Sequence, residues 1–186
     1  MVSKKGISTW KQKQEYQILA PETFEGKRVG STLASDEKKL IGRKITVSLK
    51  DLTDDRAKQH IKVTFKIVST SGSNAITKFD SFNIAIGYLK SRTRKGMKKV
   101  DYIMDLKVSD ASIRIKTVVI TDKRISKNQR SEIAKKMTDI FNKYSGLKLD
   151  EFVQLTLFGK LGTELYHNVK NICRISRVEV YEIKTL

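Results

Sequence analysis

Side chains that could carry catalysis are few in this sequence. Asp51, Asp54 and Asp55 lie close together and could hold a magnesium ion for phosphoryl chemistry, such as cleavage of RNA. The same acids also suit the start of a helix, where carboxylates favour the positive end of the helix dipole, and we favour that interpretation. The two histidines, His60 and His167, have no ligand pattern near them. These residues therefore do not indicate an enzyme.

The single cysteine, Cys173, excludes a thiolate zinc site and an internal disulfide, and we interpret it as a buried structural residue. A reducing compartment such as the cytoplasm is the simple interpretation. The sequence contains no phosphate-binding loop and no dinucleotide-binding glycine motif. We therefore expect no catalytic residue, no cofactor, no metal and no small-molecule substrate.

Basic side chains dominate the chain, with 38 Lys and Arg against 20 Asp and Glu and a formal net charge of +18. A folded chain with this excess attracts polyanions through a salt-dependent electrostatic term. Nucleic acid is the first candidate partner, and anionic membranes and acidic proteins are its competitors. Arginine can bind phosphate through two parallel hydrogen bonds, and lysine supplies a flexible point charge. Two segments are densest in these residues: Lys90, Arg92, Arg94, Lys95, Lys98 and Lys99, and then Lys123, Arg124, Lys127 and Arg130.

A third basic group surrounds the single tryptophan, Trp10, near the start of the chain. It consists of Lys4, Lys5, Lys11 and Lys13. We expect residues 1–20 to form a basic N-terminal arm and residues 21–186 to form a single RNA-binding domain. Trp10 either stacks on a base or anchors the arm to the folded body, and the anchor is slightly favoured. Tyr16 and Phe24 are interpreted as packing residues.

These cations must be positioned by helices and strands, and the first elements predicted along the chain are strands. Alternating apolar residues predict half-buried strands at 44–49 and 61–67, and a third strand at 75–79. Thr53 is expected to cap a short helix that follows the first strand. A long hairpin is expected between residues 100–108 and 113–120. Because one dense basic segment enters this hairpin and the other leaves it, both should form one contiguous patch at the same end.

Helical spacing dominates the later part of the chain. It predicts one helix from a cap at Ser131 to a stop at Gly146, a second from 149 towards Gly159 and a third over 161–172. A final strand is expected around Val178 and Val180. This order indicates an α+β fold with a mostly antiparallel sheet, for which a barrel-like arrangement is one option, and with the C-terminal helices packed on it. No apolar run is long enough to span a membrane, and the N-terminus does not resemble a secretory signal.

Two motifs near the N-terminus resemble a known family. The first is Trp10-Lys11-x-Lys13-x-x-Tyr16-x-Ile18-x-Ala20-Pro21-x-x-Phe24, followed by Val29-Gly30-x-Thr32. The second is Leu40-x-Gly42-Arg43, which leads into Val47-Ser48-Leu49-x-Asp51-Leu52. Both resemble the opening of the archaeal and eukaryotic small-subunit ribosomal protein S-three-a family, also called eS-one. Looser matches continue in order to Val178-x-Val180, so the resemblance covers almost the whole chain.

The resemblance implies a structural component of the small ribosomal subunit, located in the cytoplasm and bound to ribosomal RNA and to neighbouring ribosomal proteins. It places the protein on the platform near the mRNA exit, with mRNA nearby and no membrane contact. It implies RNA contact for Lys11, Lys13 and Arg43 and tight backbone geometry for the matching glycines. The chain lacks the long lysine-rich extension and basic tail of eukaryotic members, which favours an archaeal source. A metal-dependent RNA nuclease and a basic DNA-binding chromatin protein are the alternatives.

Overall fold

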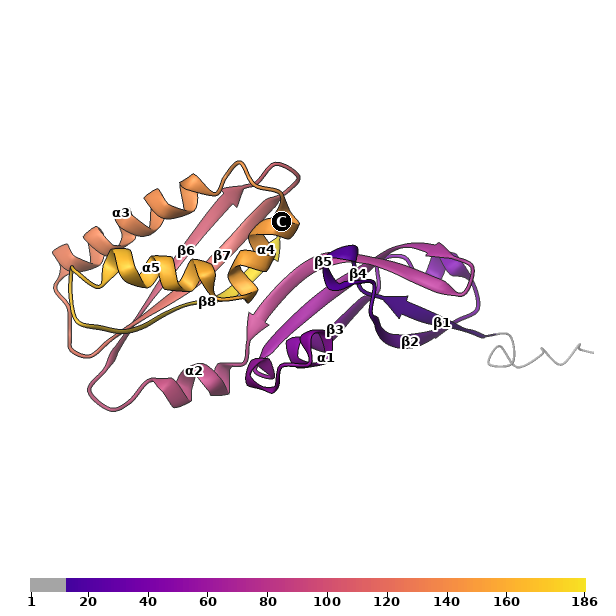
Figure 1. The fold of residues 1–186 in the computed structure, drawn as a ribbon, viewed down its shortest axis with the longest axis horizontal. Coiled ribbons are helices and arrows are strands. Elements are labelled where there is room, and N and C mark those ends of the chain that lie inside the picture. Colours follow the sequence, from indigo (N-terminus) through magenta and orange to yellow (C-terminus); the bar gives the residue numbers. More distant parts are fainter. Residues whose placement is uncertain (1–12) are drawn as a thin grey trace, which may run out of the picture. The chain divides into compact units, whose positions relative to one another are not determined.

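The computed structural model describes residues 13–186, and the chain divides into two compact units (Figure 1). Of the described residues, 13–59 and 63–80 form the first unit, and 60–62 and 81–186 form the second. Most of the expected N-terminal arm lies outside the described residues, but Gln14–Leu19 at its end already form strand β1. The division of the chain into a basic arm and a single domain stays a prediction.

The first unit is built mainly from strands. Its elements are β1 (Gln14–Leu19), η2 (Glu22–Phe24), β2 (Arg28–Ala34), η3 (Glu37–Lys39), β3 (Lys44–Ser48), α1 (Leu49–Thr53), η4 (Arg56–Lys58) and most of β4 (Ile61–Ser71) and β5 (Asn74–Ile84). Strand β1 pairs antiparallel with β2 and, over a short stretch, parallel with β5. Strand β4 pairs with both β3 and β5, and its two-residue link to β5 makes that pair antiparallel.

The core of the first unit confirms the expected strand faces. Val63, Phe65 and Ile67 are buried in this unit, as their alternation along β4 predicts. Ile61, at the start of the same strand, is also buried but belongs to the second unit. Tyr16 is buried in the first unit, and the rings of Phe24 and Phe65 meet edge to face with centroids 5.5 Å apart. Tyr16 and Phe24 are therefore packing residues, as expected.

The short helix after β3 begins earlier than predicted. Ser48 caps α1, because its hydroxyl accepts a hydrogen bond from the Lys50 N–H at 3.3 Å. Thr53 is the last residue of this helix, so the expected cap at Thr53 is wrong. Asp55 instead caps the next turn, η4, by accepting from the Ala57 N–H at 2.9 Å. The strand brings the chain to Ser48 in an extended conformation, which is the geometry a capping residue needs.

The second unit combines three antiparallel strands with helices. Its elements are the end of β5, α2 (Ile86–Arg92), β6 (Lys98–Lys107), β7 (Ser112–Thr121), α3 (Lys127–Lys143), α4 (Leu149–Leu157), α5 (Lys160–Val169) and β8 (Ile175–Thr185). The predicted long hairpin is confirmed, because β6 and β7 pair in unbroken register from Lys98 opposite Thr121 to Lys107 opposite Ser112. Strand β8 pairs antiparallel with β7 and with the end of β5.

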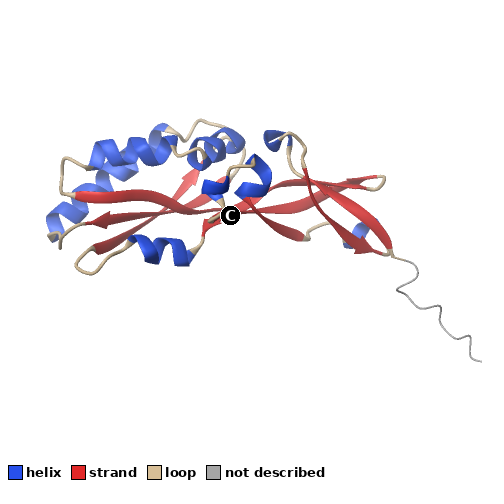
Figure 2. Cartoon of the chain, turned by 60° about the horizontal axis from the view of Figure 1, so that its bottom comes forward, coloured by secondary structure: helices blue, strands red, loops and turns tan. Residues whose placement is uncertain are grey.

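The sheet confirms the α+β fold class but is not closed. Its strands follow the order β2-β1-β5-β8-β7-β6, with β3 and β4 off this path. The pairs β1–β2, β5–β8, β6–β7 and β7–β8 are antiparallel, and β1–β5 is parallel. Helices α3, α4 and α5 lie on one face of the β6–β7–β8 strands (Figures 1 and 2). The described residues therefore give an open sheet, with no barrel. No helix within residues 13–186 is long and apolar enough to span a membrane.

The cap of helix α3 lies five positions before the predicted one. Ser126 accepts from the Gln129 N–H at 3.3 Å, and the Gln129 side chain accepts from the Ser126 N–H at 3.0 Å, which completes a capping box. Ser131 is an exposed residue inside the helix, so the expected cap there is wrong. The first turn of α3 is wholly polar, which hides it from a search for apolar periodicity. The third predicted helix ends at Val169, so Ile172 lies beyond it.

Candidate nucleic-acid interface

The junction between the β6–β7 hairpin and helix α3 forms a basic hollow of about 390 Å³. It exists because β6 begins directly beside the end of β7, and α3 begins shortly after β7 ends. We call this site the basic hollow. It is lined by Lys98, Lys99, Val100, Arg124, Ile125, Ser126, Lys127 and Arg130.

The cations of the basic hollow are largely uncompensated. Lys99 forms an ion pair with Asp101 at 2.9 Å. Four others, Lys98, Arg124, Lys127 and Arg130, are exposed and form no ion pair with any of the described residues. The positive end of the α3 dipole adds to their field. The hollow is therefore a concentrated positive site that suits phosphate groups.

Only some residues of the two dense basic segments come together at the basic hollow. Lys98 and Lys99 of the first segment meet Arg124, Lys127 and Arg130 of the second, as the hairpin argument predicts.

The remaining members lie apart from this hollow. Lys90, Arg94, Lys95 and Lys123 are exposed but do not line it. Arg92 lies on α2 with its guanidinium 5.0 Å from the centroid of the Tyr88 ring. The two segments thus meet only at the hairpin end, and the expected single patch of all their members, like the RNA-contact role of each residue, stays a prediction.

Arg43, which belongs to the second family motif, has a clear structural role. Its Nε donates to the Lys39 carbonyl at 2.9 Å, and its Nη1 donates to Thr32 Oγ1 at 2.9 Å and to the Leu33 carbonyl at 3.1 Å. These bonds tie η3 to β2. Contact of Arg43 with RNA stays a prediction, since the second guanidinium nitrogen still carries donors.

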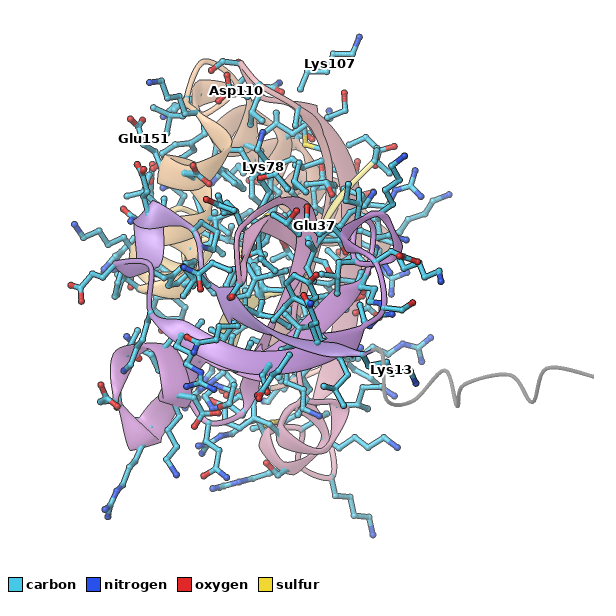
Figure 3. The ribbon with its side chains drawn as sticks, turned by 90° about the vertical axis from the view of Figure 1, so that its right-hand side faces the viewer. Lys13, Glu37, Lys78, Lys107, Asp110 and Glu151 are labelled. Atoms are coloured by element: carbon cyan, nitrogen blue, oxygen red, sulfur yellow. The ribbon has the colours of Figure 1, made fainter. Side chains whose placement is uncertain are left out.

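The cations expected on the N-terminal arm are described only in part. Lys13 is exposed immediately before β1 (Figure 3). Lys4, Lys5, Trp10 and Lys11 lie outside the described residues, so their expected roles remain predictions.

Sequence analysis missed a charge-balanced surface on the face of β6–β7–β8 opposite the helices. Arg114 binds the Asp105 carboxylate through two hydrogen bonds of 2.7 and 2.8 Å, which lowers the pKa of Asp105. Lys116 pairs with Glu182 at 2.8 Å, and this hydrogen bond raises the pKa of Lys116. The hairpin register follows from the turn near residue 110, so the pairing of Asp105 with Arg114 was accessible from the sequence. Arg114 and Lys116 on this face are thus each neutralised by a carboxylate, unlike four of the cations of the basic hollow.

The three aspartates considered for metal binding have other positions or partners, and Asp51 lies in the first turn of α1. Asp54 pairs with Lys27 at 2.7 Å, and Asp55 caps η4. The part of the chain from residue 13 onward holds no group of three His, Cys, Asp or Glu residues that could bind a metal ion. Cys173 is half-buried, and this burial raises the pKa of its thiol, in agreement with a structural cysteine.

Comparison with known proteins gives a consistent result. The chain is 38% identical over 179 residues to the small ribosomal subunit protein eS1 of Desulfurococcus amylolyticus, covering 95% of this chain and 84% of that protein. It is 34% identical over 180 residues to the protein of the same name from Methanobrevibacter smithii, covering 96% of this chain and 93% of that protein. The corresponding values for Archaeoglobus fulgidus are 36% identity over 181 residues, with coverage of 95% and 86%.

The match to a family model extends over the same length. The model of the Ribosomal S3Ae family covers residues 2–186, which include both compact units. The relatives above are ribosomal proteins, so the resemblance seen in the N-terminal motifs is confirmed across the chain. This protein therefore belongs to the ribosomal S3Ae family.

Proposed function

We propose that this member of the S3Ae family, a structural constituent of the small ribosomal subunit, binds ribosomal RNA through the basic hollow. The observation that supports this most strongly is the convergence of four uncompensated cations, Lys98, Arg124, Lys127 and Arg130, on one concave site. On the opposite face of the sheet, by contrast, Arg114 and Lys116 are each paired with a carboxylate. An unneutralised cluster is typical of a site that meets phosphates.

Contacts to the RNA backbone are expected to dominate at this site. The major groove of A-form RNA is too narrow and deep for side chains to read, so phosphate, 2′-hydroxyl and shape contacts prevail. A hollow lined by Lys and Arg at the start of a helix fits two or more phosphates better than a base edge. The other basic residues, including those of the N-terminal segment, extend this contact in our proposal.

Family resemblance also suggests where the protein works. We place it in cytoplasmic ribosomes, on the platform of the small subunit near the mRNA exit, beside other ribosomal proteins. Crosslinking of the protein within assembled subunits to ribosomal RNA and to mRNA upstream of the decoding site tests this placement. Crosslinks confined to a distant region of the subunit would contradict it.

The RNA-binding proposal is tested with two variants that remove the same number of charges. The first carries Lys98→Gln, Arg124→Gln, Lys127→Gln and Arg130→Gln in the basic hollow. The control carries Lys107→Gln, Lys143→Gln, Lys148→Gln and Lys184→Gln, all exposed residues outside the hollow. The dissociation constant for small-subunit ribosomal RNA is measured for the full-length proteins as a function of KCl concentration.

We expect the hollow variant to lose both affinity and salt dependence. Each phosphate contact contributes about 0.7 to 0.9 to the slope of log K against log salt concentration, so four lost contacts reduce the slope by about 3. The control variant should lose much less of its slope. Equal losses in both variants would show that general charge, and not the hollow, binds the RNA. A preference for duplex DNA over folded ribosomal RNA at equal salt would favour the chromatin alternative.

A further inference from the structure

A second hollow, of about 350 Å³, lies wholly within the second unit and shares no lining residue with the basic hollow. Its walls come from the first residues of β4, the end of β5, helices α4 and α5, and β8. Buried apolar side chains such as Phe82, Leu157 and Val178 form much of its lining. Gly162 of α5 also lines it, and a Cβ at this position would stand in van der Waals contact with the Val178 carbonyl oxygen, 3.7 Å away. We call this site the neutral hollow.

The polar part of the neutral hollow is a fixed network without net charge. Arg177 Nη1 donates to Glu179 Oε1 at 2.6 Å and to the Tyr88 hydroxyl at 2.9 Å. The Tyr88 ring stacks on His60, with centroids 3.7 Å apart and planes inclined by 14°. The guanidinium therefore neutralises the carboxylate and is itself held in place by an aromatic pair.

One acceptor of this network remains unused. The second carboxylate oxygen of Glu179, Oε2, is buried and has no hydrogen-bond partner among residues 13–186. A buried carboxylate oxygen normally accepts a hydrogen bond, since leaving it unpaired is costly. The neutral hollow thus combines apolar walls with one unfilled acceptor, and this combination defines what can occupy it.

The chemistry of the site selects among possible occupants. A phosphate would meet the Glu179 carboxylate, and the nearby cation Arg177 is already paired with it. A free cation would meet Arg177. An uncharged flat ring that carries an N–H donor satisfies both the walls and Oε2, and nucleobases are such rings. Unpaired bases in RNA loops are commonly held in this way, by stacking and by hydrogen bonds to their edges.

We propose that the neutral hollow captures one unpaired nucleobase of ribosomal RNA that bears an exocyclic amino group. The Glu179 carboxylate turns towards the base on binding, so that Oε2, which is buried in the free protein, accepts from that group. Adenine, cytosine and guanine carry such a group. Uracil carries its one N–H between two carbonyl oxygens, both of which the carboxylate would repel. This proposal rests on ribosomal RNA being the partner, but it concerns base recognition, whereas the basic hollow concerns phosphate contacts.

The test uses two variants of the hollow and one matched control. Glu179→Gln replaces the accepting carboxylate at nearly constant volume, and Gly162→Leu fills the cavity. The control, Glu182→Gln, removes a carboxylate from the same strand, where it pairs with Lys116 outside the hollow. Full-length proteins are bound to small-subunit ribosomal RNA at saturating concentration, and base reactivity is mapped with dimethyl sulfate and kethoxal.

We expect the wild-type protein and the Glu182→Gln control to protect one unpaired adenine, cytosine or guanine from modification. This base should become reactive in the complexes with Glu179→Gln and with Gly162→Leu. Affinity for the RNA should fall about tenfold in both hollow variants, as for the loss of one stacked and hydrogen-bonded base. The salt slope should stay unchanged, because no phosphate contact is removed.

Other outcomes separate this proposal from the broader one. If no base changes reactivity in either hollow variant while the protein still binds RNA with its normal salt slope, base capture is overturned and a side chain of a neighbouring protein becomes the occupant. A loss of the salt slope in the basic-hollow variant under the same conditions would still support phosphate binding. Thermal unfolding of Glu179→Gln at the wild-type temperature shows that the lost protection does not reflect misfolding.

Discussion

At the scale of single residues, Gly42 has a backbone conformation that explains its place in the family motif. Its φ angle is +89°, in the region that L-residues rarely adopt, and its N–H donates to the Ile67 carbonyl at 2.9 Å. The turn at Gly42 delivers Arg43 to its three acceptors on η3 and β2. The expected tight geometry at this glycine is confirmed.

Gly42→Ala is therefore expected to destabilise the protein by about 1 kcal/mol, because the methyl group is strained at this φ angle. Gly87→Ala provides the contrast. Gly87 lies inside α2 with open space around its Cα and an ordinary helical conformation, so alanine should stabilise the fold by about 0.5 to 1 kcal/mol. Urea denaturation measures both values, and the same sign for the two substitutions would contradict the argument.

Residue roles were harder to predict than residue positions. The sequence motif marks Arg43 as a cation, yet its guanidinium forms three internal hydrogen bonds. The hydrogen-bond or ion-pair partner of a charged side chain depends on which strands are neighbours in the fold. A sequence motif does not contain that information. For the same reason, Asp54 was considered as a metal ligand although it pairs with Lys27, 27 positions away in sequence.

At the scale of elements, local patterns predicted the β6–β7 hairpin well. Its two strands alternate, its turn is short, and the register then follows without further assumption. The position of the basic hollow was therefore predictable as well, because the hollow is built from the start and the end of one hairpin and from the adjoining start of a helix. The neutral hollow was not predictable, since its lining comes from β4, β5, α4, α5 and β8, which only the tertiary fold brings together.

The start of helix α3 gives a test at this scale. Ser126→Ala removes the capping side chain and should cost about 1 kcal/mol of unfolding free energy. Ser131→Ala, at the position that the sequence pattern suggested, should be neutral or slightly stabilising, because alanine is the better residue inside a helix. The two values come from urea denaturation of full-length protein. A larger loss at Ser131 than at Ser126 would contradict the observed cap.

At the scale of the whole molecule, the net charge of +18 acts in opposite directions on folding and on binding. Like charges in a compact chain repel one another, and salt screens this repulsion. We expect the melting temperature of the free protein to rise between 20 and 300 mM KCl, by about 2–4 °C for each kcal/mol gained. RNA affinity should fall over the same range.

Thermal unfolding and RNA titration in the same buffers check this pair of trends. A melting temperature that falls with salt would indicate that the surface ion pairs, such as Arg114–Asp105, outweigh the repulsion among the cations.

Strand β6 closes one edge of the sheet, and among the described strands it pairs only with β7. Its backbone groups on the other side are open to a further strand, and Ile103 in its middle is 57% exposed. Lys98 and Lys99 at one end and Lys107 at the other, which points away from the ribbon in Figure 3, oppose the approach of a second copy. We therefore expect the lysines at the start of β6 to hinder edge-to-edge pairing of free copies of this chain, in addition to any contact with RNA.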